Sequence, residues 1–223
     1  MTPMVATADG PPPTDVSDFG AAPSAVGGTR ELFANKSSGA PSAAVSGFTN
    51  VGPNLLRVSV GEAQGFVQII WDGSADDTVN PAGLGGLDFM IYDALEIFVT
   101  KSDIGGPIRF GFANALGHLA ETTIDVPGGI PNNSLVLLSV ALKPVNFTLF
   151  GSSSFEDILG NVGAVRMTID AESVAQETWE SRYAVVALTG TQAPDTAVIP
   201  LPMPALLLLT GLCGLVLAAR RCV

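Results

Sequence analysis

Three aspartates that follow an apolar run are the residues of this chain best suited to hold a metal ion. Asp72, Asp76 and Asp77 come after the run that ends at Trp71, and Gly73 lies among them. Carboxylate oxygens gathered in a flexible loop suit Ca²⁺. The spacing of an EF-hand is missing, and the same residue types form ordinary turns. We therefore interpret this segment first as a turn, keep a Ca²⁺ site as the alternative, and expect no other cofactor.

Aromatic side chains offer a second kind of chemistry, which is stacking on a sugar ring. Trp179 and Tyr92 are the candidates, because Trp71 ends an apolar run and is predicted to pack in the core. Trp179 lies among charged residues that include Glu180 and Arg182, so its ring is expected to be exposed. Together with the three aspartates, these rings suggest one alternative function, a lectin-like carbohydrate-binding module assisted by Ca²⁺.

Groups for the common forms of enzymatic catalysis are scarce. His118 is the only histidine, and it follows Gly117, a setting typical of a surface turn. Zinc ligation lacks a second histidine, and neither a Gly-x-Ser-x-Gly motif nor a P-loop is present. The two carboxylates of a glycan hydrolase meet only in space and leave no spacing signal. We therefore predict a protein that is not an enzyme and keep a glycan hydrolase as the less favoured alternative.

Charge and cysteine usage exclude several classes of partner and site. The 223 residues carry ten basic and 21 acidic side chains, a formal net charge of −11. Two of the ten, Arg220 and Arg221, lie at the C-terminal end, which leaves eight basic residues beside all 21 acidic ones. Such a surface repels nucleic acid and anionic lipid headgroups. Both cysteines, Cys213 and Cys222, also lie near the end, so the body has no disulfide and no thiolate metal site.

The C-terminal tail is built of three successive parts. These are a proline-rich stretch, an uncharged apolar run and a basic end, formed by Pro200, Leu201 and Pro202, by the 15 residues from Ala205 to Ala219, and by Arg220 and Arg221. A helix of that length spans about 22 Å, less than the hydrocarbon core of about 30 Å. We predict a marginal transmembrane helix whose arginines reach the cytoplasmic interface and act as a stop. The acidic body then lies outside the cytoplasm.

This three-part tail resembles the PEP-CTERM sorting signal, in the variant that begins Val-Pro-Leu-Pro-Ala. The matching stretch here is Ile199-Pro200-Leu201-Pro202, followed by a leucine-rich helix with glycines and by the two arginines. The resemblance implies an exported bacterial protein of the cell surface or extracellular matrix, recognised by an exosortase-type membrane protease. It also implies that extracellular polysaccharide is a partner. The residues that it assigns to sorting are Pro200, Leu201 and Pro202.

The first 28 residues have the composition of a flexible lead. They are rich in proline, glycine, alanine and serine and show little hydrophobic pattern. Ala6-Thr7-Ala8 has the form of a signal-peptidase cleavage site, although no basic and apolar leader precedes it. We therefore hypothesise that a signal peptide lies upstream of Met1.

The remaining body, residues 29–192 before the tail at 193–223, is predicted to be an antiparallel β-sandwich of jelly-roll type. Short β-type runs recur every 8 to 15 residues between turn signals, with no long helical pattern. The run from Phe66 to Trp71 is apolar on nearly both faces and should be a central strand. Alternation places Ile108, Phe110 and Phe112 on one buried face. One helical turn is expected from Phe155, with Ser154 as its cap. Further strands are expected at 30–34, 43–48, 55–60, 89–91, 95–100, 119–126, 134–142, 146–150, 165–169 and 183–188.

Overall fold

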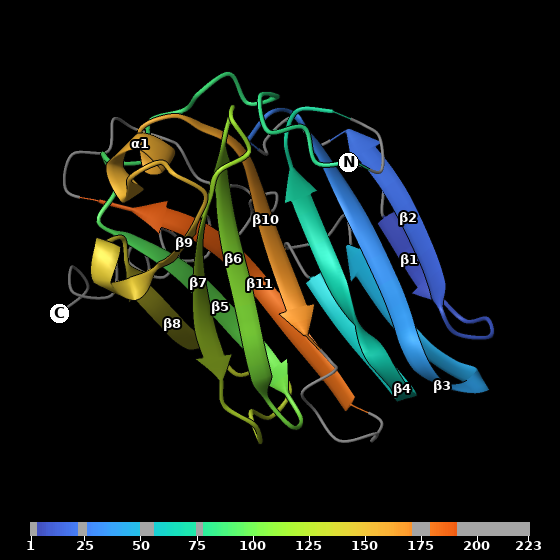
Figure 1. Ribbon diagram of the computed structural model, residues 1–223. Helices are drawn as coiled ribbons and strands as arrows, with labels where there is room; N and C mark the ends of the chain where they lie inside the picture. Colours follow the sequence, from blue (N-terminus) through green and yellow to red (C-terminus); the bar gives the residue numbers. More distant parts are fainter. Residues whose placement is uncertain (1–3, 22–25, 50–55, 75–77, 171–178, 191–223) are drawn as a thin grey trace, which may run out of the picture.

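The fold is almost entirely antiparallel β-sheet (Figure 1). The computed structural model describes residues 4–21, 26–49, 56–74, 78–170 and 179–190. The strands are β1 (Met4–Ala8), β2 (Thr14–Ala21), β3 (Thr29–Thr49), β4 (Leu56–Trp71), β5 (Ala94–Ser102), β6 (Gly106–Asn114), β7 (Leu119–Val126), β8 (Val136–Ala141), β9 (Thr148–Phe150), β10 (Val162–Asp170) and β11 (Trp179–Thr189). The helical elements are the 3₁₀ turn η1 (Pro144–Asn146) and the helix α1 (Phe155–Leu159).

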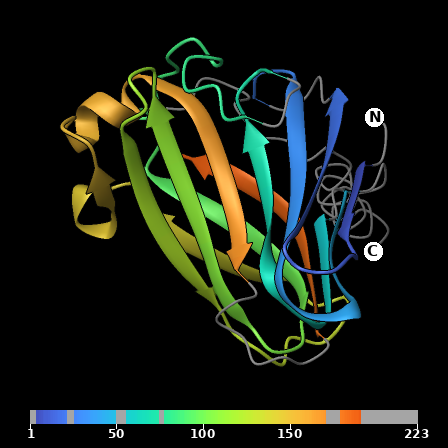
Figure 2. The same ribbon diagram turned by 45° about the vertical axis from the view of Figure 1, so that its right-hand side comes forward.

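Two long neighbouring strands, β3 and β4, belong to both layers of a sandwich. The C-terminal half of β4 pairs with β10, whereas its N-terminal half pairs with β11. β3 follows β4 along its length, with register shifts between Lys36 and Ala44. Irregularities of this kind let strands turn a corner from one sheet into the other. The front sheet has the order β9-β7-β6-β10-β4-β3-β2 and the back sheet β8-β5-β11-β4-β3-β1 (Figure 2).

The core lies between the two sheets and is formed by alternate residues of the strands. In β4, Val67, Ile69 and Trp71 are buried on the inner face. β4 pairs on both sides, so the prediction of a central strand is confirmed. Ile108, Phe110 and Phe112 are fully buried, as the alternation in this segment predicted. The all-β fold class is therefore confirmed.

The segment from β8 to α1 closes one side of the sandwich. β8 is the edge of the back sheet and β9 the edge of the front sheet, so this segment crosses between the layers. Phe147 packs against the rings of Phe112 and Phe155, with centroid distances of 6.1 and 5.0 Å. Ser154 caps α1 by accepting from the backbone N–H of Asp157, which confirms the predicted cap.

The N-terminal segment is folded, so the prediction of a flexible lead is wrong for its described residues. β1 and β2 both form antiparallel pairs with β3. In β1 the buried side chains Met4, Ala6 and Ala8 alternate with more exposed ones. Cleavage after Ala8 would therefore remove a strand of the back sheet.

Two other expectations about local structure are wrong. Residues 89–91 form no strand, because the amide of Phe89 donates to the carbonyl of Leu159 in α1 and the amide of Tyr92 donates to the carbonyl of Phe89 in a turn, just after the bridge between Leu87 and Val162. The four short strands expected within 30–71 are two long ones, since glycines and bulges bend the chain there without ending the pairing. Among the described helices, none is long and apolar enough to span a membrane. The tail lies outside the described residues.

Candidate functional site

The outer face of the front sheet carries rows of side chains that run across the strands. Arg166 in β10 stands opposite Ile70 in β4 on one side and opposite Gly111 in β6 on the other. Gly111 in turn stands opposite Glu121 in β7. Because residues opposite one another share a face, these side chains form one row that points away from the core.

Arg166 crosses over Gly111 to reach the neighbouring row member on β7. Its Nη2 donates to Oε2 of Glu121 over 2.9 Å. A Cβ on Gly111 would lie 2.9 Å from Nε and 3.1 Å from Cγ of Arg166. The absence of a side chain at position 111 therefore lets the arginine lie flat on the sheet, with its guanidinium fixed by the glutamate.

A second row holds polar groups in the same manner. Nη2 of Arg109 donates to Oδ2 of Asp170 over 2.9 Å, and Nε2 of Gln68 donates to Oγ1 of Thr168 over 2.9 Å. The half-buried rings of Phe33 and Phe66 follow on β3 and β4, with centroids 5.7 Å apart. The face thus combines oriented hydrogen-bonding groups with two adjacent aromatic rings.

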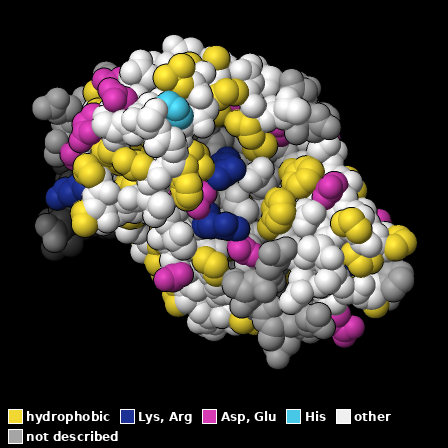
Figure 3. All heavy atoms as spheres, viewed as in Figure 1, with side chains coloured by type: hydrophobic (Ala, Val, Ile, Leu, Met, Phe, Trp, Pro, Cys, Tyr) yellow, Lys and Arg dark blue, Asp and Glu magenta, His cyan; other side chains and the backbone are white. Residues whose placement is uncertain are grey.

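Two hollows on this face meet at Val79, which belongs to the loop between β4 and β5. The first, of about 250 Å³, is lined by apolar side chains and by Arg166, and includes Pro81, Ala113 and Leu119. The second, of about 110 Å³, is lined by Ser17, Glu31, Phe33, Gln68, Ile70 and Val79. We call the two hollows together the outer groove. Figure 3 shows this face, with basic and acidic side chains at its hollowed centre and apolar side chains on both sides.

Asp72 fixes the loop that carries Val79. The carboxylate is buried, and its Oδ1 accepts from the amide and the hydroxyl of Ser74 over 3.0 and 2.8 Å. Its Oδ2 accepts from the amide of Asn80 over 2.6 Å. Both oxygens are therefore engaged in shaping the loop, which agrees with the turn interpretation of this segment. Asp76 and Asp77 lie outside the described residues, and the described ones contain no group of three or more His, Cys, Asp or Glu placed to hold a metal ion.

Comparison with known proteins gives no family. No family model matches the sequence, and no curated protein matches it. Among solved structures, a family 11 carbohydrate-binding module from Clostridium thermocellum, in complex with a β-1,3-1,4-mixed-linked tetrasaccharide, has a TM-score of 0.39 at 11% identity. That match covers 87% of this chain and 100% of the module.

Two larger proteins are similar over part of their length. PfGH50B has a TM-score of 0.42 at 9% identity over 68% of this chain, and an exo-β-agarase has 0.41 at 12% over 69%. The chain spans only 22% and 23% of these two proteins. Likeness at this level does not extend to a ligand or an activity of this chain.

Of the two residues predicted to stack on sugars, Tyr92 is buried and Trp179 belongs to a strand of the back sheet. Tyr92 is only 6% exposed and packs edge-on against Phe89 at a centroid distance of 6.0 Å, so its ring offers almost no face to solvent. Trp179 begins β11 opposite Val60 in the back sheet, and its side chain lies outside the described ones. The run of apolar residues that contains Tyr92 is too short to show which of its side chains are buried, so the sequence did not indicate that this ring lies in the core.

His118 is not among the described residues that line the outer groove. Nδ1 of His118 is 2.6 Å from Oγ of Ser153, at the turn that precedes β7. Pro200, Leu201, Pro202 and the apolar run lie outside the described residues.

Sequence reasoning missed the groove's ion pairs because their partners are distant in the chain. Arg166 and Glu121 are 45 residues apart, and Arg109 and Asp170 are 61 apart. Each was visible as a polar residue at an alternate position of a β-type run. Which two residues meet depends on the order and register of the strands, and neither can be read from a single sequence.

Proposed function

We propose that the protein binds a neutral polysaccharide chain in the outer groove. The observation that carries the proposal is the flat arrangement of Arg166 over Gly111, where Arg166 is held by Glu121 and lines the first hollow. A guanidinium fixed in this way presents its remaining N–H groups in a defined plane, suited to the hydroxyls of a sugar. A mostly apolar hollow with few oriented polar groups is the usual form of a small-ligand site.

The charge of the groove favours a neutral ligand. The positive charge of Arg166 is balanced by Glu121, and that of Arg109 by Asp170. Glu31 lines the second hollow as well. The outer groove and the second row beside it therefore have no excess positive charge to attract an acidic polymer. Phe33 and Gln68 in the groove, with Phe66 next to them, suit the apolar and polar sides of a sugar unit.

The same geometry favours binding over hydrolysis. A glycan hydrolase needs one carboxyl group that donates a proton to the leaving oxygen and a second one across the scissile bond. Glu121 and Asp170 instead each accept from an arginine, which holds them as hydrogen-bond acceptors. The proposal is therefore a carbohydrate-binding protein that is not an enzyme.

Replacing Arg166 by alanine is expected to weaken polysaccharide binding by about tenfold or more, since hydrogen bonds from charged groups contribute about 1.5 to 3 kcal/mol. The measurement is affinity electrophoresis of the full-length chain in gels that contain a mixed-linkage β-glucan, a galactomannan or a neutral agaran. Retardation of the wild type by at least one of these, lost in R166A, would support the proposal.

Arg57 supplies the matched control for this experiment. It lies in the back-sheet half of β4 and pairs with Glu180 over 3.0 Å, so Arg57→Ala also breaks an arginine–glutamate pair but on the other face. R57A should be retarded as strongly as the wild type. Equal retardation of R166A and the wild type, or no retardation of the wild type by any of the three polysaccharides, would contradict the proposal.

For the setting in which this binding takes place, we infer from the tail an exported protein of the bacterial envelope. Support comes from the proline-rich stretch, the apolar run and the final arginines of residues 199–223. An exosortase-type protease would process the tail. The body, a β-sandwich for which we propose a jelly-roll topology, would lie outside the cytoplasm next to extracellular polysaccharide. Calcium assistance through Asp76 and Asp77 stays a prediction.

Replacing Pro200 and Pro202 together by alanine is expected to abolish removal of the tail. The reason is that prolines hold the backbone in an extended conformation before the apolar run, the form in which a protease binds its substrate. The measurement is the intact mass of the envelope-bound and released protein in a host that has an exosortase. The wild type should lose about 20 to 25 residues, as a cut close to Pro200 would remove. An unprocessed wild type would leave only a single-span anchor.

A further inference from the structure

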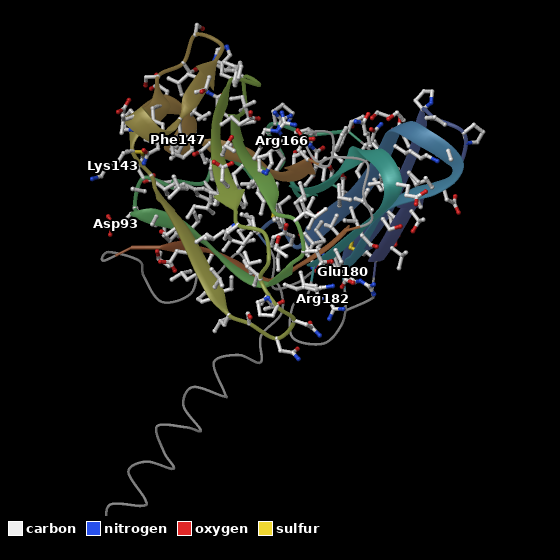
Figure 4. The ribbon with its side chains drawn as sticks, turned by 90° about the horizontal axis from the view of Figure 1, so that it is seen from below. Asp93, Lys143, Phe147, Arg166, Glu180 and Arg182 are labelled. Atoms are coloured by element: carbon white, nitrogen blue, oxygen red, sulfur yellow. The ribbon has the colours of Figure 1, made fainter. Side chains whose placement is uncertain are left out.

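A cluster of charged side chains lies on the back sheet, on the face opposite the outer groove. Arg57 of β4, Lys101 of β5 and Arg182 of β11 all contact the carboxylate of Glu180. Figure 4 shows Glu180 and Arg182 on one side of the sandwich and Arg166 on the other. We call this set, together with Asp103, which pairs with Lys101 over 3.2 Å, the Arg182 cluster.

The Arg182 cluster gathers cationic side chains in a strongly acidic protein. Among the described residues it holds three cationic side chains and two carboxylates, whereas the whole chain has a formal net charge of −11. Burial acts to raise the pKa of Glu180, but the hydrogen bond from Arg182 and the charges of Arg57, Arg182 and Lys101 outweigh it, so that pKa is lowered. Glu180 therefore stays ionised at neutral pH and holds Arg182 in place.

A hollow of about 380 Å³ adjoins Arg182, a size within the range of small-ligand sites. Its other lining residues include Thr100, Asn132, Asn133, Ser134 and Leu135. Nε of Arg182 donates to Glu180, and Nη1 donates to Oδ1 of Asn132 over 3.2 Å. The guanidinium has five N–H groups, so these two bonds leave further donors at the edge of the hollow.

We propose that this hollow binds a carboxylate-bearing sugar unit, such as a uronic acid, with its carboxylate on Arg182. The amide and hydroxyl groups of Asn133 and Ser134 face the same hollow and match sugar hydroxyls, and Leu135, which is 68% exposed, offers an apolar contact. The choice of a saccharide rests on the proposed function. The acidic unit and the neutral chain then bind on opposite faces, so the protein would link two strands or two segments of one matrix polysaccharide.

The sugar's charge provides a direct test. Trigalacturonate is titrated into the full-length protein at low salt by isothermal calorimetry, with its fully methyl-esterified form as the uncharged control. We expect the free acid to bind at least about tenfold more tightly than the ester, and expect its affinity to fall as salt screens the charge. Equal binding of acid and ester, or no binding of the acid, would overturn the proposal. A triglutamate peptide that binds as tightly as trigalacturonate would overturn the choice of a saccharide.

Variants locate the site. Arg182→Gln is expected to weaken trigalacturonate binding by about tenfold or more, whereas Arg109→Gln in the front sheet should leave it unchanged. Asn133 has a φ of 65°, which glycine adopts freely, so N133G combined with S134A removes two sugar-facing groups without backbone strain. This double variant, which leaves the ion pairs intact, should bind about threefold or more weakly. Should R182Q fail to fold, wild-type affinity in the double variant would overturn the proposal.

The proposals for the two sites can be contradicted independently of each other. Neutral polysaccharide is lost in R166A and kept in R182Q if the outer groove binds it, whereas trigalacturonate shows the reverse pattern if the Arg182 cluster binds it. Loss of trigalacturonate binding in R166A would contradict the assignment to the back sheet.

Discussion

Replacing Lys36 by methionine is expected to destabilise the fold by about 3 to 5 kcal/mol. Lys36 is fully buried where β3 turns from the front sheet into the back sheet. Its Nζ donates to the carbonyl oxygens of Gly10, Ala40 and Ala43 over 2.8, 2.7 and 2.6 Å. All three ammonium donors are therefore used, and they tie the bend of β3 to the turn between β1 and β2. Methionine keeps the apolar stem but leaves these carbonyls without their donor.

Urea denaturation of the full-length chain in mild detergent, followed by tryptophan fluorescence, measures this loss, because the ring of Trp71 is buried and reports on the core. Lys143→Met is the matched control. Lys143 is exposed, and its side chain makes no hydrogen bond or ion pair among the described residues, so its replacement should change the free energy of unfolding by less than about 0.5 kcal/mol. A K36M protein as stable as K143M would show that the corner is held by sheet pairing alone.

Lys36 illustrates what a single sequence conceals. A lysine between asparagine and serine has the local pattern of a solvent-exposed turn, and nothing nearby indicates that its ammonium group lies inside the fold. Its three acceptors come from the corner of β3 and from the turn before β2, so the burial depends on a bend that local propensity does not encode. For the same reason, β1 and β2 could not be predicted. Their place in the fold depends on pairing with β3, which their sparse apolar pattern does not indicate.

The central strands were predictable because their physical signal is local. Val67 and Ile69 belong to a run that is apolar on nearly both faces, which indicates a strand with neighbours on both sides. Alternation in β6 gave the buried face, and the Ser154 cap gave the start of α1. The candidate sites were not predictable. The role proposed for Arg166 depends on Glu121 of another strand, and the role proposed for Arg182 depends on a hollow that three separate segments of the chain line.

The positions of the two sites also explain how one acidic domain can offer two chemically different surfaces. Each arginine is held by a glutamate on its own sheet, but the ion pairs at the outer groove are balanced one to one, whereas three cations contact Glu180. Because the core separates the two faces, a change in one ion pair is expected to leave the other intact. The variants R166A and R182Q can therefore be interpreted independently.

Replacing Phe112 by alanine is expected to cost about 3 to 5 kcal/mol, the usual range for a buried phenylalanine. The ring of Phe112 is fully buried and contacts Phe89 edge-on at 5.8 Å and Phe147 at 6.1 Å, so its loss leaves a cavity between the front sheet and the segment that closes the sandwich. The same urea titration measures the effect. Phe150→Ala is the control, because that ring is 50% exposed on the edge strand β9 and should cost well under 1 kcal/mol. If F112A were no less stable than F150A, the segment from β8 to α1 would have to close over the cavity, and Phe147 would not be the contact that joins the two sheets on this side.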